Sequence, residues 1–518
     1  RRSSDLQRRS AVALLFKSGA RGDPGNYRPI ALMSVEVKVL SRALAYRLAK
    51  IAGHLVHPSQ AGFIPGRRLH DHVILVQALQ TFCTNEDHDY YASFLDFSKA
   101  YDMVNQEFLF DVLKEMNIGP TFVSWVQLLY NSPLVQIIFN DGLGPTIRPN
   151  RGVKQGCPLS CMLFVLYLEP LGEMLRSSPQ LGIPLPNNDL LTSIFFADDT
   201  TLLSSSLEAA VEQMAIVEDF CSVSGARLNT AKCVTLALNN NLDVEDIDDG
   251  GLLNILPSAK PVKYLGILFG HRLPINFQVQ QLNDKFLAAF QVWGSRARTL
   301  QGRKLIVSTM LLSMLWHVTA AVPVPRAVVT TWQRMVNKYI LGRKTSLNES
   351  HRPSISRKWQ FDKEIGLGIP HIASKLRTQR LLRLQLLMRV DTSEVQSPWQ
   401  LLVQRQFART MNKLSRPSHP FDFLLYYPNR SSKWLFLWEL HPLWHDIWQQ
   451  WALIPMTDRI ATPPNLDTIL NLPVWLSSYQ TLQAGTNGTL ANVVKTPACR
   501  RWCRNGANNG FHSLKDFL

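Results

Sequence analysis

Cysteine is scarce in this chain, and its placement excludes a disulfide framework. The seven cysteines among 518 residues are odd in number and scattered, at Cys83, Cys157, Cys161, Cys221, Cys233, Cys499 and Cys503. This pattern favours a reducing, intracellular compartment over a secreted, disulfide-bonded class of protein. The chain has no signal-peptide pattern and begins at Arg1 rather than Met, so we expect a piece of a longer open reading frame.

Tryptophan is almost absent from the first half of the chain. Only Trp125 precedes residue 270, and the other 12 of the 13 tryptophans follow it. Because 518 residues are too many for one ordinary domain, we use this change in composition as a boundary. We predict three regions, at residues 1–270, 271–395 and 396–518. Internal repeats and long low-complexity tracts are absent, and a hydrophobic content of 46% excludes a disordered chain.

One long segment lacks charge altogether. Residues 305–325 carry no charged side chain and are long enough to cross a bilayer. However, polar side chains recur one helical turn apart at Thr309, Ser313 and His317, and two prolines close the segment. We therefore predict a buried helix of a soluble domain rather than a membrane span, and no membrane partner.

Charge is distributed in three blocks. Residues 1–70 contain 13 Lys or Arg and 3 Asp or Glu, which gives a net charge of +10. Residues 71–270 contain 10 and 24, which gives −14, and residues 271–518 contain 32 and 12, which gives +20. Basic walls around an acidic centre suit a polyphosphate partner, whose phosphates the walls would neutralise. Solvated faces of a basic protein are the alternative.

Hydrophobic periodicity and turn residues predict mixed secondary structure over the first 225 residues. Helices are expected at residues 34–51, 69–81, 159–176 and 208–224, together with a helix that ends at Tyr130. Strands are expected at 91–97 and 134–139, and at 191–196 and 200–203, which would form a hairpin. Ser98 is expected to cap a further helix, and Gly225 to end the helix over 208–224.

Two short motifs about one hundred residues apart place carboxylates at the ends of apolar, strand-like runs. The first is FLDFSKAYD at residues 94–102, and the second is FFADD at 195–199. Turns would aim Asp96, Asp198 and Asp199 into a cleft. Mg²⁺ prefers oxygen ligands, and two such ions can assist both oxygens in phosphoryl transfer. One aspartate after a strand is common in ordinary turns, but the two motifs together predict this chemistry.

A third motif, RGVKQGCPLS at residues 151–160, lies between the aspartate motifs. Its glycines would let the backbone approach a ligand closely, and Gln155 could hydrogen-bond a base or a sugar. Pro158 helps to set the start of the apolar helix. A plain helix N-terminus after a turn is the alternative interpretation.

The order of these blocks resembles the reverse transcriptase of non-LTR retrotransposons of the long interspersed element type. The resemblance covers roughly residues 12–270 and is carried by seven blocks, which are NYRPI at 26–30, QAGFIPGR at 60–67, the three motifs above, SGARLNTAK at 224–232 and KYLGI at 263–267. A weaker similarity extends to about residue 385, through Arg303-Lys304 before an apolar helix and GLGIP at 366–370.

This resemblance implies an α+β, right-hand polymerase with fingers, palm and thumb, an antiparallel palm sheet and a mostly helical C-terminal region. It implies an RNA-directed DNA polymerase that copies retrotransposon RNA into cDNA. Asp96, Asp198 and Asp199 would hold two Mg²⁺ ions, with Mn²⁺ as a substitute, and join a primer 3′-hydroxyl to the α-phosphate of a dNTP.

The resemblance also assigns substrate-binding residues. Tyr101, one helical turn after Asp96, matches the aromatic gate that rejects a ribose 2′-hydroxyl. The other residues assigned are Lys17 and Arg28 on the triphosphate, Gln155 and Gly156 at the nascent base pair, Lys232 as a proton donor to pyrophosphate, and Tyr264, Leu265 and Gly266 in the primer grip. Both lysines could equally be ordinary surface residues. Asp102 is expected to serve packing or capping.

The sequence departs from the family pattern at two positions. Phe196 stands where many relatives carry Tyr. Cys161 stands where a Pro often follows the Pro-Leu-Ser run of residues 158–160. Neither change removes a catalytic atom.

The last 120 residues are less readable. Trp434, Trp438, Trp444, Trp448 and Trp451 recur at helical spacing and are expected in a core, although stacking on bases is the alternative. Cys499, Cys503 and His512 resemble a zinc knuckle that lacks its fourth ligand, so zinc binding stays open.

The expected partners are an RNA template, a DNA primer or target, and dNTPs. The resemblance further implies a ribonucleoprotein with the element's own RNA, nuclear and cytoplasmic, and an endonuclease module that we expect to be missing from this chain. A maturase of the group II intron type and a decayed, non-catalytic nucleic-acid-binding remnant are the alternatives.

Overall fold

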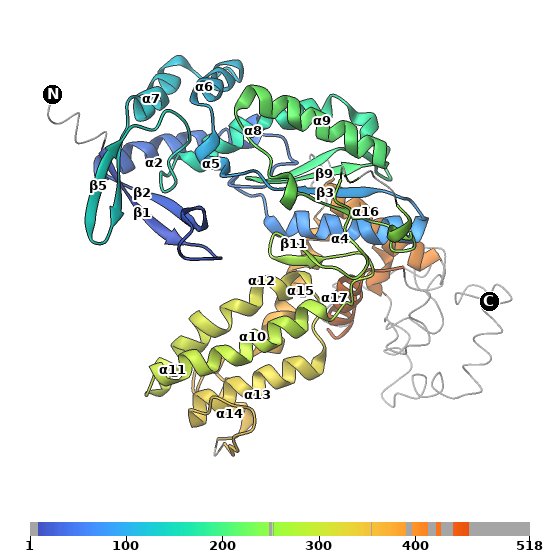
Figure 1. Ribbon diagram of the computed structural model, residues 1–518. Coiled ribbons are helices and arrows are strands. Elements are labelled where there is room, and N and C mark those ends of the chain that lie inside the picture. Colours follow the sequence, from blue (N-terminus) through green and yellow to red (C-terminus); the bar gives the residue numbers. More distant parts are fainter. Residues whose placement is uncertain are drawn as a thin grey trace. The chain divides into compact units, whose positions relative to one another are not determined.

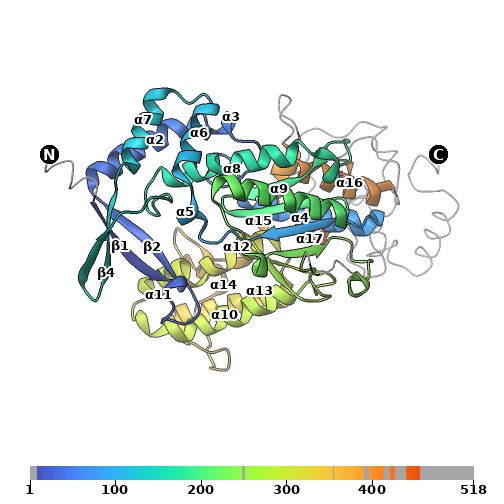
Figure 2. The same ribbon diagram turned by 45° about the horizontal axis from the view of Figure 1, so that its top comes forward.

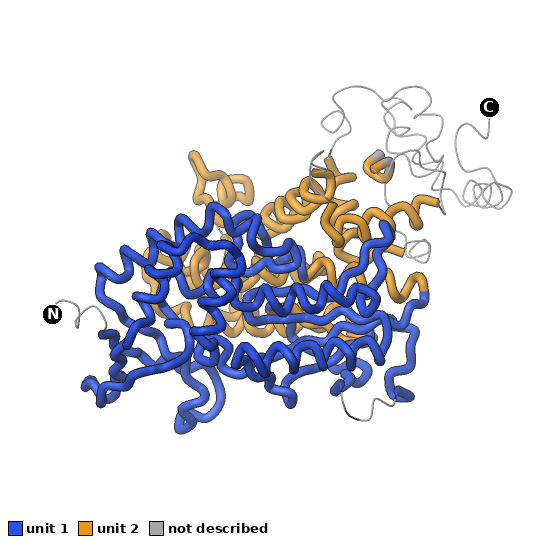
Figure 3. The backbone as a smooth tube through the Cα atoms, turned by 90° about the horizontal axis from the view of Figure 1, so that it is seen from above, with its two compact units in different colours: residues 1–72, 87–265 blue, residues 73–86, 266–518 orange. Residues whose placement is uncertain are grey.

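The computed structural model describes residues 9–247, 251, 253–353, 355–389, 396–412, 421–425 and 439–454. The chain divides into two compact units, of which unit 1 comprises residues 1–72 and 87–265, and unit 2 comprises residues 73–86 and 266–518 (Figure 3). Helix α4 (Leu69–Glu86) therefore supplies most of its length to unit 2, although it lies inside the first region predicted from sequence.

The first sheet of unit 1 has the strand order β2-β1-β4-β5. Strands β1 (Arg9–Phe16) and β2 (Tyr27–Met33) form an antiparallel hairpin, β1 pairs in parallel with β4 (Leu134–Phe139), and β5 (Gly142–Ile147) closes the edge. Around it the chain forms α2 (Val35–Ala49), α3 (Ala52–Leu55), α6 (Gln106–Glu115) and α7 (Pro120–Tyr130).

The second sheet of unit 1 is antiparallel throughout, in the order β10-β3-β9-β8. Its strands are β3 (Tyr91–Leu95), β8 (Ser193–Phe196), β9 (Asp199–Ser204) and β10 (Val234–Ala237). All five residues of β3 are buried, as expected of a central strand. Helices α8 (Ser160–Arg176) and α9 (Leu207–Ser224) cover one face of it (Figure 1). This arrangement confirms the predicted antiparallel palm sheet.

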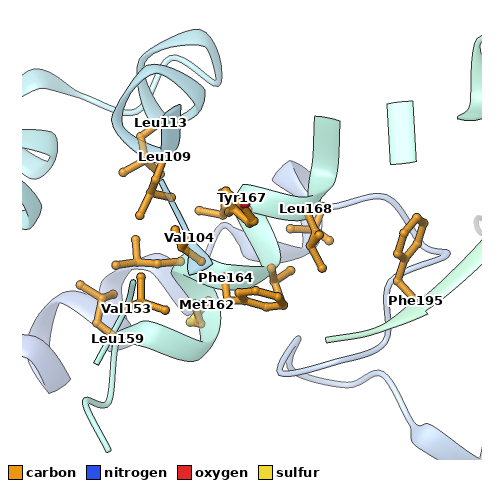
Figure 4. Close-up of a cluster of buried hydrophobic side chains, with 14 of the residues drawn as sticks. Val104, Leu109, Leu113, Val153, Leu159, Met162, Phe164, Tyr167, Leu168 and Phe195 are labelled. Atoms are coloured by element: carbon orange, nitrogen blue, oxygen red, sulfur yellow. The ribbon is translucent and has the colours of Figure 1, made fainter. Parts of the chain in front are cut away.

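The main core of unit 1 gathers around α8. Every residue from Met162 to Leu168 is buried, so this helix is apolar on all sides. In Figure 4, side chains from α6, from the 151–159 loop and from β8 meet those of α8. A helix buried in this way holds the loop before it and the strand beside it in fixed positions.

Unit 2 is mostly helical in its described part. The long helices are α10 (Phe277–Trp293), α13 (Arg326–Gly342), α15 (Ile372–Met388), α16 (Pro398–Asn412) and α17 (Pro442–Ala452), with the short α14 (Arg357–Phe361) between α13 and α15 (Figure 2). Phe286, Phe290 and Trp332 form a fully buried aromatic core between α10 and α13.

The uncharged segment is not one continuous helix, which corrects the sequence prediction. It is divided into α11 (Leu300–Ile306), a π-turn at Val307–Leu311 and α12 (Ser313–Ala321). Thr309 and Ser313 bond carbonyl oxygens one turn earlier, which is a known cause of helix bending. Among the described residues no single helix is long and apolar enough to cross a bilayer, whereas Leu300–Leu311 and Ser313–Ala321 meet that condition as a pair bent by 41°.

Most other predicted elements are confirmed, with two differences. Helix α4 continues to Glu86, five residues beyond its predicted end. The prediction that Ser98 caps a helix is wrong, because α5 (Ala100–Met103) has four residues and its N-cap is Lys99, at φ +46°. Strand β3 ends at Leu95, so a turn separates it from α5.

Two of the predicted tryptophans near the C-terminus confirm a core role, whereas Trp451 is only partly buried. Trp444 and Trp448 on α17 are almost fully buried, and they pack against Trp399 and Phe407 of α16. Trp434, Trp438, Cys499, Cys503 and His512 lie outside the described residues.

Candidate active site

The three aspartates lie at one end of the antiparallel sheet. Leu95, the last residue of β3, pairs with Thr200 of β9, so Asp96 and Asp199 occupy the next positions on the two strands. Asp199 itself pairs with Phe196 across the β8–β9 hairpin, and Asp198 lies in its bend. Since residues opposite each other in such a ladder lie about 5 Å apart, the register places Asp96 beside Asp199, with Asp198 next to Asp199 in the chain.

The segment after α9 supports the backbone at Asp96. The Asn229 N–H donates to the Asp96 carbonyl at 2.8 Å, and the Ser98 N–H donates to the Arg227 carbonyl at 2.8 Å. Lys232, a predicted substrate residue, follows this segment, and its Nζ lies 3.8 Å from Asp96 Oδ2. Both side chains are about half exposed or more, so this long ion pair is weak and leaves Lys232 available to a ligand.

Gln60 holds the bend of the aspartate hairpin. Its Oε1 accepts from the Ala197 N–H at 2.9 Å and from the Gly62 N–H at 2.8 Å, and the side chain is 2% exposed. Ala197 has a φ of +55°, a left-handed conformation that is unfavourable for alanine. The hydrogen bond that Ala197 donates to Gln60 thus stabilises a strained residue directly before Asp198.

The segment around Gln60 adds further bonds to the same hairpin. The Ala61 N–H donates to the Phe195 carbonyl and the Phe195 N–H to the Ser59 carbonyl, each at 2.8 Å. A Cβ atom at Gly62 would lie 2.3 Å from the Ala197 nitrogen, so only glycine allows this approach.

Arg67 holds that segment in turn. Its guanidinium donates to the backbone carbonyls of Gly53, Val56, His57 and Gln60, at 2.7 to 3.2 Å. Four bonds from one side chain leave the segment little freedom to move. Gln60 and Arg67 belong to a block that the sequence singled out, yet their positioning role could not be seen there, because Gln60 and Ala197 are 137 residues apart.

The electrostatics of the site reflect concentrated negative charge. Burial, followed by the charges of Asp198 and Asp96, raises the pKa of Asp199 to about 6. Burial is also the largest cause of the raised pKa of Asp198, and Asp96 adds to it. The positive charges of Lys17 and Arg28 act to lower the pKa of Asp198. Both predicted triphosphate ligands therefore lie within electrostatic range of Asp198. They occupy adjoining positions of the β1–β2 hairpin.

The glycine-containing loop is anchored on both sides. The Gly152 N–H donates to the Val104 carbonyl, and a Cβ there would meet the Asp102 carbonyl at 2.9 Å. The Gln155 carbonyl accepts from the Ala31 N–H at 2.7 Å, and Gly156 adopts φ +103° against the same strand. The Gln155 side chain donates to Asp102 Oδ1 at 3.2 Å, which gives Asp102 the packing role predicted for it.

Tyr101 lies on the core of unit 1. Its ring stacks on Phe164 with centroids 4.6 Å apart, and its backbone carbonyl accepts from the Val153 N–H. Burial, then the Cys161 thiol, raises its pKa, so the hydroxyl is protonated at neutral pH. The ring is therefore held against Phe164, within electrostatic range of Asp198.

The predicted primer grip forms a tight turn. Strands β11 (Val262–Tyr264) and β12 (Ile267–Phe269) flank Leu265 and Gly266, which both adopt positive φ angles. Tyr264 is 4% exposed and packs on Phe94 of β3, with ring centroids 5.0 Å apart. Tyr264 thus anchors this turn beneath the sheet, and its ring is not available to a ligand.

Among the residues that the structure describes, no three His, Cys, Asp or Glu side chains converge into a ready cation site. The donor chemistry nevertheless suits Mg²⁺, which typically takes one or two carboxylates and completes its shell with water and substrate phosphates. Burial is the largest cause of the raised pKa values of Asp198 and Asp199, and the neighbouring carboxylate charges that add to it are charges that a cation would offset.

Comparison with known proteins gives one family and several relatives. Residues 17–269 match the family model described as reverse transcriptase (RNA-dependent DNA polymerase). The Transposon TX1 uncharacterized 149 kDa protein of Xenopus laevis is 28% identical over 74% of this chain and 29% of its own length. The Pol polyprotein from the type-2 retrotransposable element R2DM of Drosophila melanogaster is 28% identical over 76% and 38%.

The chain thus spans less than two fifths of the length of these relatives. Among solved structures, apo telomerase from Candida Tropicalis aligns with 76% of this chain and 69% of its own, at 10% identity and a TM-score of 0.38.

Proposed function

Because residues 17–269 belong to the reverse transcriptase family, we propose that this chain is an RNA-directed DNA polymerase that extends a primer 3′-hydroxyl with dNTPs. The observation that carries the proposal is the register of β3, β8 and β9, which gathers Asp96, Asp198 and Asp199 at one sheet end. Burial, followed by the charges of Asp198 and Asp96, raises the pKa of Asp199, and carboxylates perturbed in this way are common at functional sites.

Asp96, Asp198 and Asp199 are the residues that would hold Mg²⁺. When bound, two Mg²⁺ ions would activate the attacking 3′-hydroxyl and neutralise charge on the leaving pyrophosphate. The protein's contribution is positional, since Gln60 and Arg67 fix the hairpin bend and the 227–229 segment fixes Asp96. Fixed carboxylates lower the cost of reorganisation during the reaction.

The substrate roles follow from charge and shape. Lys17 and Arg28 would bind the triphosphate, because they are the cations that lower the pKa of Asp198. Tyr101 would exclude a ribose 2′-hydroxyl, since its ring is stacked in place on Phe164. Lys232, which faces Asp96, would donate a proton to the departing pyrophosphate. Gln155 and Gly156 would lie beside the nascent base pair, and the turn at Leu265 and Gly266 would contact the primer.

The relatives named above are a transposon protein and a retrotransposon Pol polyprotein, so we propose retrotransposon RNA as the template. A ribonucleoprotein of this chain with that RNA follows from the same proposal. Any nicking of a DNA target belongs to an endonuclease module that the proposal assigns to another polypeptide segment.

Primer extension tests the proposal. A labelled DNA primer annealed to an RNA template is incubated with dNTPs and Mg²⁺, and the Asp198→Asn variant is compared with Glu212→Gln, the same carboxylate-to-amide change at an exposed position of α9. Extension by the wild type and Glu212→Gln, but not by Asp198→Asn, supports the assignment. Normal extension by Asp198→Asn overturns the catalytic assignment. Absence of extension in all three, with salt-sensitive RNA binding retained, favours the non-catalytic remnant.

A further inference from the structure

A continuous groove runs along α13 in unit 2. It consists of two cavities of about 600 and 570 Å³ that share Val329, Thr330 and Ala373 in their linings. We call this combined hollow the α13 groove. Its walls come from α13, α14, α15 and α17, and all of these belong to unit 2.

Arginines line the α13 groove on two sides. Arg326 and Arg334 lie on one face of α13 with Thr330 between them, at successive four-residue steps that span about 12 Å. Arg377 of α15 and Arg357 of α14 line the same two cavities. None of these four guanidinium groups makes an ion pair or a hydrogen bond with the part of the chain that the structure describes. Their charge is therefore available to a ligand.

The single carboxylate in the lining does not offset these charges. Asp446 is held by Arg380, whose Nε donates to its Oδ2 at 2.7 Å. Arg380 is 2% exposed and also donates to the carbonyls of Thr319 and Val322, so it serves the fold. With this pair neutral, the groove retains the positive charges of Arg326, Arg334, Arg357 and Arg377, and that of Lys338, whose Nζ donates to the Leu347 and Glu349 carbonyls. It therefore suits a polyanion.

The second cavity is lined by a chain of amide side chains that hydrogen-bond one another. Gln333 donates to Asn337 and to the Pro370 carbonyl, and Asn337 donates to Gln360. Beside this amide chain, the rings of Phe361 and His371 meet edge to face, 4.7 Å apart. Amides and aromatic rings can pack against the flat face of an unpaired base, whereas a duplex keeps its base faces stacked and presents only base edges and backbone.

We propose that the α13 groove binds a single strand of nucleic acid, with its phosphates on Arg326, Arg334, Arg357 and Arg377 and one or two bases in the cavities. The choice of nucleic acid as the polyanion rests on the proposed polymerase function. Arg326 and Arg334 lie only about 12 Å apart along α13, so the groove is a short subsite within a longer strand.

Equilibrium binding of a labelled 20-nucleotide single-stranded RNA, measured over a range of salt concentrations without dNTPs, tests this proposal. The variant Arg326→Gln/Arg334→Gln is compared with Lys285→Gln/Arg298→Gln, which removes two exposed charges of unit 2 outside the groove. Each phosphate contact contributes about 0.7 to the slope of log K against log salt for single strands. We expect the groove variant to lose about 1.4 from that slope and the control variant to lose less than half as much.

Three further ligands make the result specific. Single-stranded DNA of the same sequence shows whether the site distinguishes ribose from deoxyribose. Provided that RNA binds as expected, the proposal is supported whether or not the DNA binds equally well. Duplex DNA should show no difference between the groove variant and its control. Polyglutamate should not displace the RNA. The single-strand assignment would be overturned by equal slopes for the two variants on RNA, by displacement of the RNA by polyglutamate, or by a loss of slope in the groove variant on duplex DNA as large as its loss on RNA.

The outcome of this binding assay is independent of the outcome of the primer-extension assay. A wild-type chain that extends no primer but shows the expected loss of slope leaves the groove standing and removes the proposed function. A chain that extends primers but shows equal slopes keeps the function and removes the groove. Arg326 and Arg334 are both exposed, so the two substitutions leave the packed core of α13 unchanged.

Discussion

The side-chain oxygen of Gln60 accepts a hydrogen bond from the backbone N–H of Ala197, the residue that directly precedes Asp198. This bond joins a segment near the N-terminus to the bend of the β8–β9 hairpin. Because Ala197 adopts a strained left-handed conformation, the bond does more than link two elements. It selects the backbone geometry from which Asp198 and Asp199 project.

Gln60→Met should therefore impair catalysis as well as stability. The change keeps the length of the side chain but leaves the buried Ala197 N–H without its acceptor, at a cost of about 1–3 kcal/mol in unfolding free energy. We expect kcat for primer extension to fall while KM for dNTP changes little, because the carboxylates move but the triphosphate ligands do not. Urea denaturation and steady-state extension measure the two effects.

Gln213→Met is the matched control for that variant. Gln213 is equally buried and bonds Ser204 at the far end of β9, as well as the carbonyls of Thr192 and Leu203. A similar loss of stability with kcat largely retained is expected. Equal losses of kcat in both variants would mean that Gln60 acts only through stability.

Gly62→Ala should disturb the same bend by steric overlap. The added Cβ would lie 2.3 Å from the backbone nitrogen of Ala197, so the two segments must separate, at a typical cost of about 1–3 kcal/mol. Gly53→Ala provides the comparison, because no atom lies within 4 Å of its Cβ position and the residue is helical. We expect Gly53→Ala to be neutral or to stabilise the chain by about 0.5–1 kcal/mol. If thermal unfolding showed Gly53→Ala to be less stable than Gly62→Ala, the close approach of Gly62 to Ala197 would be contradicted.

His72 should make the chain less stable as the pH falls. Burial, followed by the charge of Arg67, lowers the pKa of His72 to about 4. Above pH 6.5 the imidazole is neutral in both states and has no effect. Between pH 6.5 and 4 the unfolded chain takes up a proton that the folded chain does not, so stability falls by about 1.4 kcal/mol per pH unit.

Substituting His72 isolates this contribution. The difference in unfolding free energy between wild type and His72→Leu should change with pH over that window and be constant above it. His54→Leu, at an exposed position, controls for the loss of a histidine. A difference that does not vary with pH between 6.5 and 4 would show that His72 is not held neutral.

Tyr101→Ala should relax discrimination against ribonucleotides. The ring is fixed by its stacking on Phe164, and its removal opens the space near Asp96. Tyr101→Phe keeps the ring and should keep the discrimination, because a steric gate needs the ring and not the hydroxyl. The ratio of kcat/KM for dNTP and rNTP in single-nucleotide incorporation measures the effect. An unchanged ratio in Tyr101→Ala would remove the gate assignment.

Local patterns were sufficient for most of the secondary structure near the site. The helix over Ser160–Arg176 and the helix that stops at Gly225 follow from apolar runs and from a glycine at φ +80°. The predicted cap at Ser98 failed, because tertiary bonds to Arg227 and Asn229 hold that turn and shift the helix start to Ala100. The uncharged segment appeared continuous because composition does not reveal a π-turn.

By itself the sequence was sufficient to single out the candidate residues, which are Asp96, Asp198, Asp199, Lys17, Arg28 and Tyr101, because they lie in short local motifs. Tertiary structure alone decided how these groups are held. The bond from Ala197 to Gln60 joins residues 137 positions apart, and the α13 groove gathers arginines from three helices. The physical reason is that side-chain type depends on one position, whereas strand register and hydrogen-bond geometry depend on distant segments packed together.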